Sequence, residues 1–131
     1  MSAKDLAKYR YEMAVEKLEA AKVLEENGFY KDSISRSYYA IFTGARSLLA
    51  LENKDSTKHS GIISLFNRYF VKTELVDKNY SKILAKAKIY RERGDYGDFF
   101  VVSEEEVIEQ IENAETFLKE IKKNIDNLLK E

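Results

Sequence analysis

The feature that most constrains this chain is the stretch from Asp32 to Glu52, which is apolar on one side and built of small residues on the other. The apolar positions recur at the helical period, as in a bundle helix that faces a core. On the other side, small residues recur at steps of three and four, so a second backbone can approach closely. They are Ser33, Ser37, Ala40, Gly44 and Ser47. We therefore predict a central helix that is enclosed on most sides.

Two arginines, Arg36 and Arg46, are the only charged residues between Ser33 and Leu51. They lie roughly 15 Å apart along a helix. Because this stretch has no acidic partner for them, we expect carboxylates from other helices, a partner subunit or a bound anion. The row of small residues serves packing either within the monomer or across a two-fold axis, and the sequence leaves both open.

Composition limits the chemistry that this chain can perform. Its 131 residues are the length of one domain, spanning 1–131, with a single core. The absence of Cys excludes disulfides and thiolate chemistry, and one His leaves little material for a zinc centre, so we expect no metal and no cofactor. The net charge of −1 excludes a basic surface over the whole chain. Any nucleotide or RNA site is therefore local, and no DNA partner is expected.

The sequence also bears on where the protein works. The first ten residues lack the apolar segment of a signal peptide, and no run of 18 apolar residues occurs anywhere. We expect a soluble cytoplasmic protein that does not enter a membrane.

Apolar periodicity predicts four further helices besides the central one. The last is the clearest, because Ser103 and Glu106 form a capping box and Val102 can pack on Val107. Gly28 is expected to end the first helix and Gly94 the fourth. Short loops join these elements, so the fold class is all-α: an antiparallel up-and-down bundle of four long helices and one short helix. The further helices are expected near residues 3–27, 58–70, 77–93 and 103–128.

His59 is the only imidazole, and it stands beside Lys58 in the first turn of the short helix. One interpretation makes the pair a general base or anion-contacting site, since free amides at a helix start and a lysine attract phosphate. The alternative is a histidine hydrogen-bonded at the rim of the core. Its place on the apolar face of that helix favours the second interpretation.

The segment from Arg91 to Asp98 gathers arginines, aspartates, glycines and Tyr96 beyond a predicted helix end. Functional groups often lie in such loops, so Arg91, Arg93 and Tyr96 are candidate ligand-binding residues. The alternative is a helix cap whose arginines and aspartates pair with each other. A nearby basic stripe, Lys78, Lys82 and Lys86, is interpreted as a solvated face.

Four blocks of this sequence together resemble a HEPN domain, a nucleotide-binding domain of prokaryotes and higher eukaryotes. The resemblance covers about residues 11–125 and implies a bundle of four or five helices that is usually a homodimer. It also implies that a small stand-alone protein of this kind is often paired with a minimal nucleotidyltransferase, in some cases as toxin and antitoxin, and that the partner can transfer AMP to a tyrosine. The blocks are GFYKDSISRSYYAIF (28–42), KHSGII (58–63), Arg91 with Asp95 and Tyr96, and a last helix with Ala114 and Phe117.

Many HEPN proteins are metal-independent ribonucleases with an arginine followed four to six residues later by a histidine. This sequence departs from that pattern. His59 lies thirteen positions after Arg46, and Tyr96 stands five positions after Arg91. Because cleavage by this route loses its usual imidazole, we favour binding over cutting.

The resemblance thus predicts a dimeric nucleotide-binding or partner-binding module that acts with a minimal nucleotidyltransferase in a toxin–antitoxin-like pair. Its nucleotide-binding residues are expected to be Arg91, Arg93 and Tyr96, with Lys58 and His59, and none is assigned as catalytic. The alternative function is a metal-independent endoribonuclease toxin.

Overall fold

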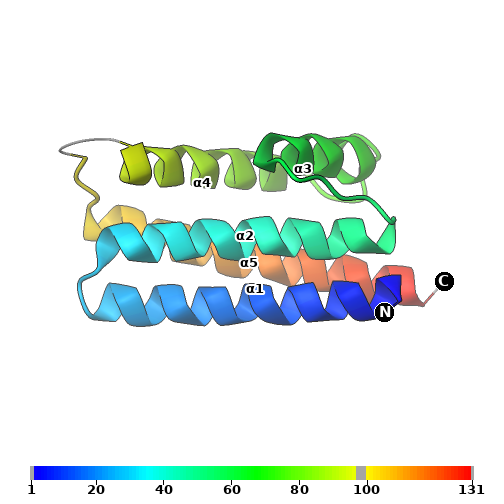
Figure 1. Cartoon of the computed structure of the whole chain (residues 1–131), viewed down its shortest axis with the longest axis horizontal. Coiled ribbons are helices and arrows are strands. Elements are labelled where there is room, and N and C mark those ends of the chain that lie inside the picture. The colour runs from blue at the N-terminus through cyan, green and yellow to red at the C-terminus, as the bar shows by residue number, and fades with distance from the viewer. Residues whose placement is uncertain (1, 97–99, 131) are drawn as a thin grey trace.

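The computed structural model describes residues 2–96 and 100–130, and the chain folds as a helical bundle. Figure 1 shows α1, α2 and α5 running side by side, with α3 and α4 in line along one edge. The chain reverses direction between α1 and α2, as expected for an antiparallel hairpin. The predicted fold class is confirmed. The helices are α1 (Ala3–Glu26), α2 (Tyr30–Leu51), the short α3 (His59–Phe66), α4 (Lys78–Tyr96) and α5 (Glu104–Leu129).

Helix α2 is the central element, and thirteen of its 22 residues are buried. All four other helices pack against it. The prediction of an enclosed helix is confirmed for most of its circumference, but Arg36 is exposed and can be solvated. Arg46 meets a carboxylate that comes from a loop, Asp55, rather than from another helix.

The row of small residues on α2 is used within the chain. Ser33 donates a hydrogen bond from Oγ to the carbonyl oxygen of Ala21 on α1, at 2.7 Å. A Cβ atom added to Gly44 would lie 2.6 Å from Leu118 Cδ2 on α5. Close approach of two backbones therefore explains these small side chains, and the open choice between internal packing and a two-fold axis falls to internal packing.

The predicted helix ends at Gly28 and Ser103 have the geometry that their sequences indicate. Gly28 follows α1 with φ at +80°, a conformation that glycine adopts without steric cost. Ser103 Oγ accepts from the backbone N–H of Glu106, and Glu106 caps the Ser103 N–H in return. Val102 and Val107 are both buried in the core, as the staple requires.

Two predicted boundaries were wrong. The third helix is shorter than expected, because α3 gives way to a π-helical segment at Asn67–Val71. The fourth helix continues past Gly94 to Tyr96, so Gly94 is not a helix end. An ion pair between Arg91 and Asp95, one turn apart, spans this glycine and supports the helix there. None of the described helices is long and apolar enough to cross a membrane.

Candidate functional site

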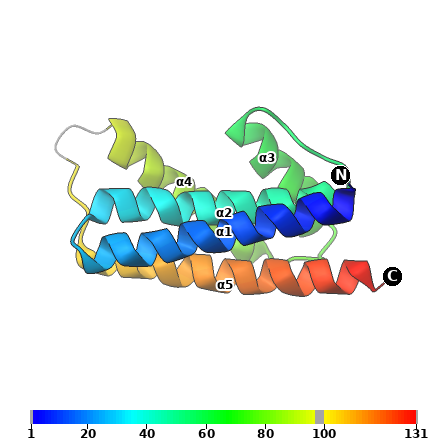
Figure 2. The same ribbon diagram turned by 60° about the horizontal axis from the view of Figure 1, so that its bottom comes forward.

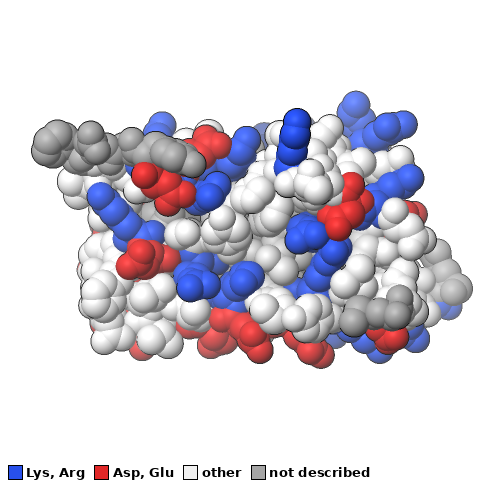
Figure 3. Space-filling model, viewed as in Figure 1, with Lys and Arg blue, Asp and Glu red and all other residues white. Residues whose placement is uncertain are grey.

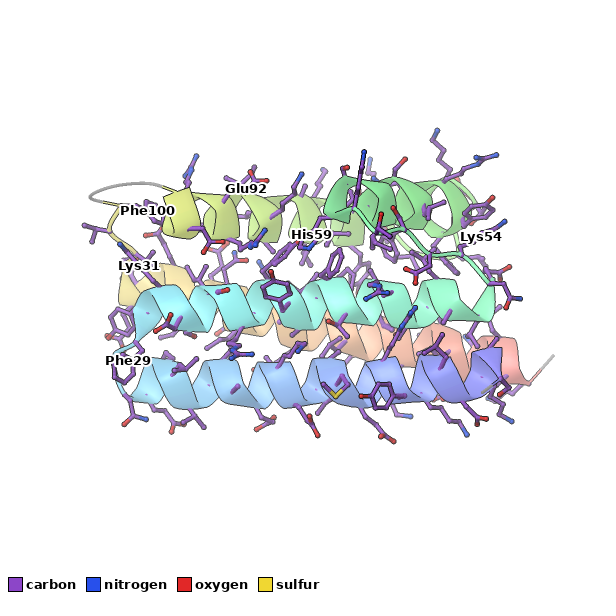
Figure 4. The ribbon with its side chains drawn as sticks, in the orientation of Figure 1. Phe29, Lys31, Lys54, His59, Glu92 and Phe100 are labelled. Atoms are coloured by element: carbon purple, nitrogen blue, oxygen red, sulfur yellow. The ribbon has the colours of Figure 1, made fainter. Side chains whose placement is uncertain are left out.

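The side of α2 that faces α3 carries an aromatic cluster around His59. The His59 ring stacks on Phe42 with ring centroids 4.3 Å apart and planes at 26°. Its centroid lies 5.7 Å from the Tyr38 ring and 6.0 Å from the Tyr39 ring. Figure 4 shows His59 at the start of α3, directed toward α2. Aromatic rings thus fix the imidazole in position.

A hydrogen bond determines which nitrogen of His59 carries the proton. Tyr38 Oη lies 2.7 Å from His59 Nδ1. Tyr38 is fully buried, and burial raises the pKa of its phenol, so the hydroxyl keeps its proton. If Nδ1 were the donor, the Tyr38 proton would need another acceptor, and a buried donor without one is costly. We therefore assign Tyr38 as the donor and place the proton of neutral His59 on Nε2.

Arg91 from α4 lies over the same two tyrosines. The guanidinium carbon is 5.6 Å from the Tyr38 ring centroid and 5.3 Å from that of Tyr39, within the range of cation–π interactions. Arg91 Nε also lies 3.1 Å from Asp95 Oδ2, as the interpretation of self-paired loop charges expects. This Nε atom is buried and lacks an aligned hydrogen-bond partner in the described part of the chain. Arg91 is therefore held by the two ring faces and by its ion pair with Asp95.

Positive charge surrounds His59 and keeps it neutral. Burial lowers the pKa of the imidazole, and the nearby charges of Arg91, Lys88 and Arg46 lower it further. At neutral pH the ring is therefore uncharged, with a donor on Nε2 and its other nitrogen occupied by Tyr38. The site offers hydrogen-bond donors and positive charge, which suit an anionic ligand.

A surface pocket of about 550 Å³ opens beside this cluster. Within it, Arg46 makes a two-pronged ion pair with Asp55, with contacts of 3.0 to 3.3 Å. Figure 3 shows basic side chains along the line of α2, interrupted by a few acidic ones, while acidic side chains gather at the middle of the lower edge and basic ones at its right end. The pocket is therefore next to a locally positive surface on a chain of almost no net charge. Its lining residues are Phe42, Arg46, Asp55, Ser56, Thr57 and His59.

The predicted site residues are only partly brought together. Arg91 and His59 converge on Tyr38 and Tyr39. Lys58 is exposed at the N-cap position of α3. Arg93 is exposed. Hydrogen bonds from Ser103 and Tyr90 lower the pKa of Glu106 on α5, and the charge of Arg93 lowers it slightly further. Tyr96 is the last residue of α4, and its side chain lies outside the described residues.

Sequence reasoning missed the aromatic walls of the site. Tyr38 and Phe42 belong to the apolar side of α2 that was expected to face the core, which is correct for their burial, but their contact with His59 was not predicted. A signal was present in the double tyrosine. Adjacent helix residues point about 100° apart, so Tyr38 and Tyr39 cannot share one core direction. Tyr39 is only partly buried, and its ring meets Arg91.

Comparison with known proteins identifies the family. The HEPN domain matches residues 7–125. The chain is 40% identical over 118 residues to a Methanocaldococcus jannaschii protein named "Putative toxin", covering 90% of this chain and 87% of that protein. It is 37% identical over 123 residues to a UPF0332 protein of Thermotoga maritima, covering 94% and 93%. The chain belongs to the HEPN domain family.

Proposed function

We propose that this protein is a toxin-like HEPN module whose site binds a nucleotide through phosphate and base. The observation that carries the proposal is the convergence of Arg91 and His59 on the paired tyrosines of α2. A guanidinium is suited to phosphate because its donors match two oxygens at once. The partly exposed ring of Tyr39 is suited to a base, because stacking on an aromatic face needs no particular base.

The protonation state of His59 supports binding rather than cutting. A general base needs a free lone pair that faces the reacting group. In His59 the lone pair is on Nδ1 and is occupied by Tyr38, while Nε2 carries the proton. The imidazole therefore presents a donor, which stabilises a bound phosphate but does not abstract a proton.

Calorimetry with ATP, GTP and AMP tests this function. We expect binding by the full chain that is weakened in Arg91→Ala. Arg68→Ala is the matched control, because Arg68 also lies over a tyrosine ring, that of Tyr69, away from the site. Absence of binding by any of the three nucleotides at millimolar concentration, with or without a nucleotidyltransferase partner, would refute the proposal.

The sequence-based assignment of Arg93, Tyr96 and Lys58 is part of the same proposal. The nucleotide affinity of Arg93→Ala distinguishes a site that includes Arg93 from one limited to Arg91 and His59. An effect as large as that of Arg91→Ala would extend the site along the end of α4, whereas an unchanged affinity would confine it to the aromatic cluster. Tyr96→Phe tests in the same way whether the hydroxyl of Tyr96 contributes to nucleotide affinity.

The assembly that we propose is a homodimer acting with a minimal nucleotidyltransferase as a toxin–antitoxin-like pair. Its support is the family membership and the name of the M. jannaschii relative. Light scattering of the purified chain measures the dimer, and co-purification with a nucleotidyltransferase from a neighbouring reading frame measures the pair. A monomer in solution and no such neighbour would count against this assembly.

One observation favours the second candidate, a metal-independent endoribonuclease. Arg91 and His59 both lie against the Tyr39 ring, so folding brings together the arginine and histidine that the sequence spacing separates. In that case expression should arrest growth and degrade RNA, and Arg91→Ala should abolish both effects. Harmless expression with intact cellular RNA would exclude it.

A further inference from the structure

The position of His59 depends on the loop between α2 and α3. This loop carries the chain from the end of α2 back over the bundle, so that α3 begins above the middle of α2. Figure 2 shows the loop arching from the end of α2 near the N-terminus to the start of α3, which stands above α2. A loop held only at its ends would allow many positions for the first turn of α3. Further contacts must therefore hold this loop in the position at which Tyr38 Oη reaches His59 Nδ1.

Asp55 connects this loop to two helices at once. Its Oδ1 accepts from Arg46 Nε at 3.3 Å and from the backbone N–H of Ser56 at 2.8 Å. Its Oδ2 accepts from Arg46 Nη2 at 3.0 Å and from Arg10 Nη2 at 3.1 Å. Arg10 belongs to α1 and Arg46 to α2, so one carboxylate joins two helices to the loop.

The electrostatics of Asp55 agree with a structural connection. Burial alone would raise the pKa of its carboxyl, but hydrogen bonds from Arg46 and the Ser56 backbone and the charges of both arginines outweigh it. The net result is a lowered pKa, so the carboxylate is charged at neutral pH. An isolated exposed ion pair contributes little, whereas a carboxylate with a bidentate arginine and a second arginine forms a network.

The connection continues from Asp55 into the first turn of α3. Ser56 Oγ accepts from the backbone N–H of Lys58 at 3.2 Å. A Cβ atom added to Gly61 would lie 2.1 Å from the same Oγ. Ser56 is thus fitted against α3 two residues beyond His59, and a loop fixed at Asp55 fixes the helix start as well.

We propose that Asp55 is a positioning residue, which fixes the α2–α3 loop through Arg10 and Arg46 so that His59 Nδ1 reaches the hydroxyl of Tyr38. Its consequence for nucleotide affinity rests on the proposed function, but its consequence for His59 does not. Asp55 acts through His59 and is not assigned a contact with the ligand.

The pKa of His59 distinguishes positioning from a simple charge effect, because the two predict opposite signs. If Asp55 acted only as a nearby negative charge, Asp55→Asn would lower the pKa of His59 further. If Asp55 positions the loop, the imidazole leaves its buried place in the variant, and its pKa rises toward 6.5. The groups that face His59 are Tyr38, Tyr39 and Arg46 from α2 and Lys88 and Arg91 from α4.

NMR of the full chain without ligand measures this directly, since His59 is the only histidine. We expect Asp55→Asn to raise the pKa of His59 and to remove the nitrogen-15 signature of an unprotonated Nδ1 that accepts a hydrogen bond. Asp126→Asn is the matched control, because it removes an exposed aspartate and its ion pair to Lys122 on α5. The control should leave both signals unchanged.

Gly61→Ala tests the same connection with every charge retained. The added Cβ displaces Ser56, so the His59 pKa should rise here too. This variant decides the question if circular dichroism shows that Asp55→Asn has unfolded. A lowered or unchanged His59 pKa in folded Asp55→Asn, or an unchanged one in folded Gly61→Ala, would overturn the proposal.

ATP titration of the same samples separates this inference from the proposed function. We expect roughly tenfold weaker binding in Asp55→Asn if the site uses His59. Failure of the wild-type chain to bind nucleotides would refute the proposed function while the His59 signals still decide the role of Asp55. Weaker binding with unchanged His59 signals would refute positioning and leave nucleotide binding standing.

Discussion

Two faces of helix α2 differ in what they are built to do. The face toward α1 and α5 is closed by small and apolar side chains, with Ser33 bonded to the α1 backbone and Gly44 against Leu118. The face toward α3 and α4 carries the buried Tyr38 and the partly exposed Tyr39, which contact His59 of α3 and Arg91 of α4. The first face is packed within the chain, whereas the second carries the proposed ligand site. Under this proposal, stability and ligand binding are separated on opposite sides of one helix.

The largest expected effect is on the closed side. Phe117 of α5 is fully buried, and its Cε1 lies 3.7 Å from where a Cβ atom on Gly44 of α2 would be. Its ring also lies 5.6 Å from that of Phe66, at the end of α3 opposite to His59. Phe117→Ala should lower the free energy of unfolding by about 3–5 kcal/mol, because it leaves a cavity. Urea denaturation measures the loss. The His59 NMR signal of the remaining folded protein should be unchanged, and a shifted signal would show that the two faces are not independent.

Arg91→Ala probes the open side. We expect nucleotide affinity to fall roughly tenfold to a hundredfold, as for the loss of a charged hydrogen-bond donor. Stability should change much less than in Phe117→Ala, because Arg91 contributes ring contacts and one partly exposed ion pair. Calorimetry and urea denaturation measure the two quantities. A large loss of stability with unchanged affinity would instead make Arg91 structural.

The pH dependence of stability gives a smaller signal from the same side. Since folding lowers the pKa of His59, the unfolded chain takes up the proton first as pH falls below 6.5. The contribution of His59 to stability is therefore fully present above pH 6.5 and decreases as pH falls toward its pKa in the folded state. Urea denaturation across this range measures the slope. His59→Gln should remove it, and an unchanged slope would place its origin elsewhere.

The smallest effect is expected away from both faces. Lys86 on α4 pairs with Glu109 on α5, and both side chains are about half exposed. Solvent screens such a pair, so Lys86→Ala should change stability by no more than about 0.5 kcal/mol. It should leave nucleotide affinity unchanged, since the lysine stripe is interpreted as a solvated face. Weaker nucleotide binding in this variant would extend the positive site along α4.

The sequence predicted the parts of the fold that depend on near neighbours. The apolar stripe of α2, the left-handed Gly28 and the Ser103 capping box all act within a few residues, and each was confirmed. Gly94 shows the limit of such reasoning. It has the residue type of a helix end, yet α4 continues through it to Tyr96. A local preference of about 1 kcal/mol is easily overridden by surrounding contacts.

The candidate site could be predicted only as a set of residues. Arg91 and His59 were identified as candidates from their types and positions, and the departure from the ribonuclease spacing was visible in the sequence. The residues that contact Arg91 and His59 were not predicted. Tyr38 lies in the apolar stripe of α2 and Asp55 in a loop, yet Tyr38 is hydrogen-bonded to His59 and Asp55 to the loop backbone before it. Burial and function are not exclusive, so a core pattern concealed a site residue.

By itself, the sequence determined the all-helical fold class, the helix ends at Gly28 and Ser103 and the enclosed nature of α2, because each follows from interactions between residues close along the chain. Only the tertiary structure decided that His59, Tyr38 and Arg91 meet, and that Asp55 links α1 and α2 to the loop. His59 and Tyr38 are 21 positions apart, and Asp55 and Arg10 are 45 apart. These long-range contacts depend on how whole helices pack against one another. That packing follows from the core as a whole and not from any short segment of the sequence.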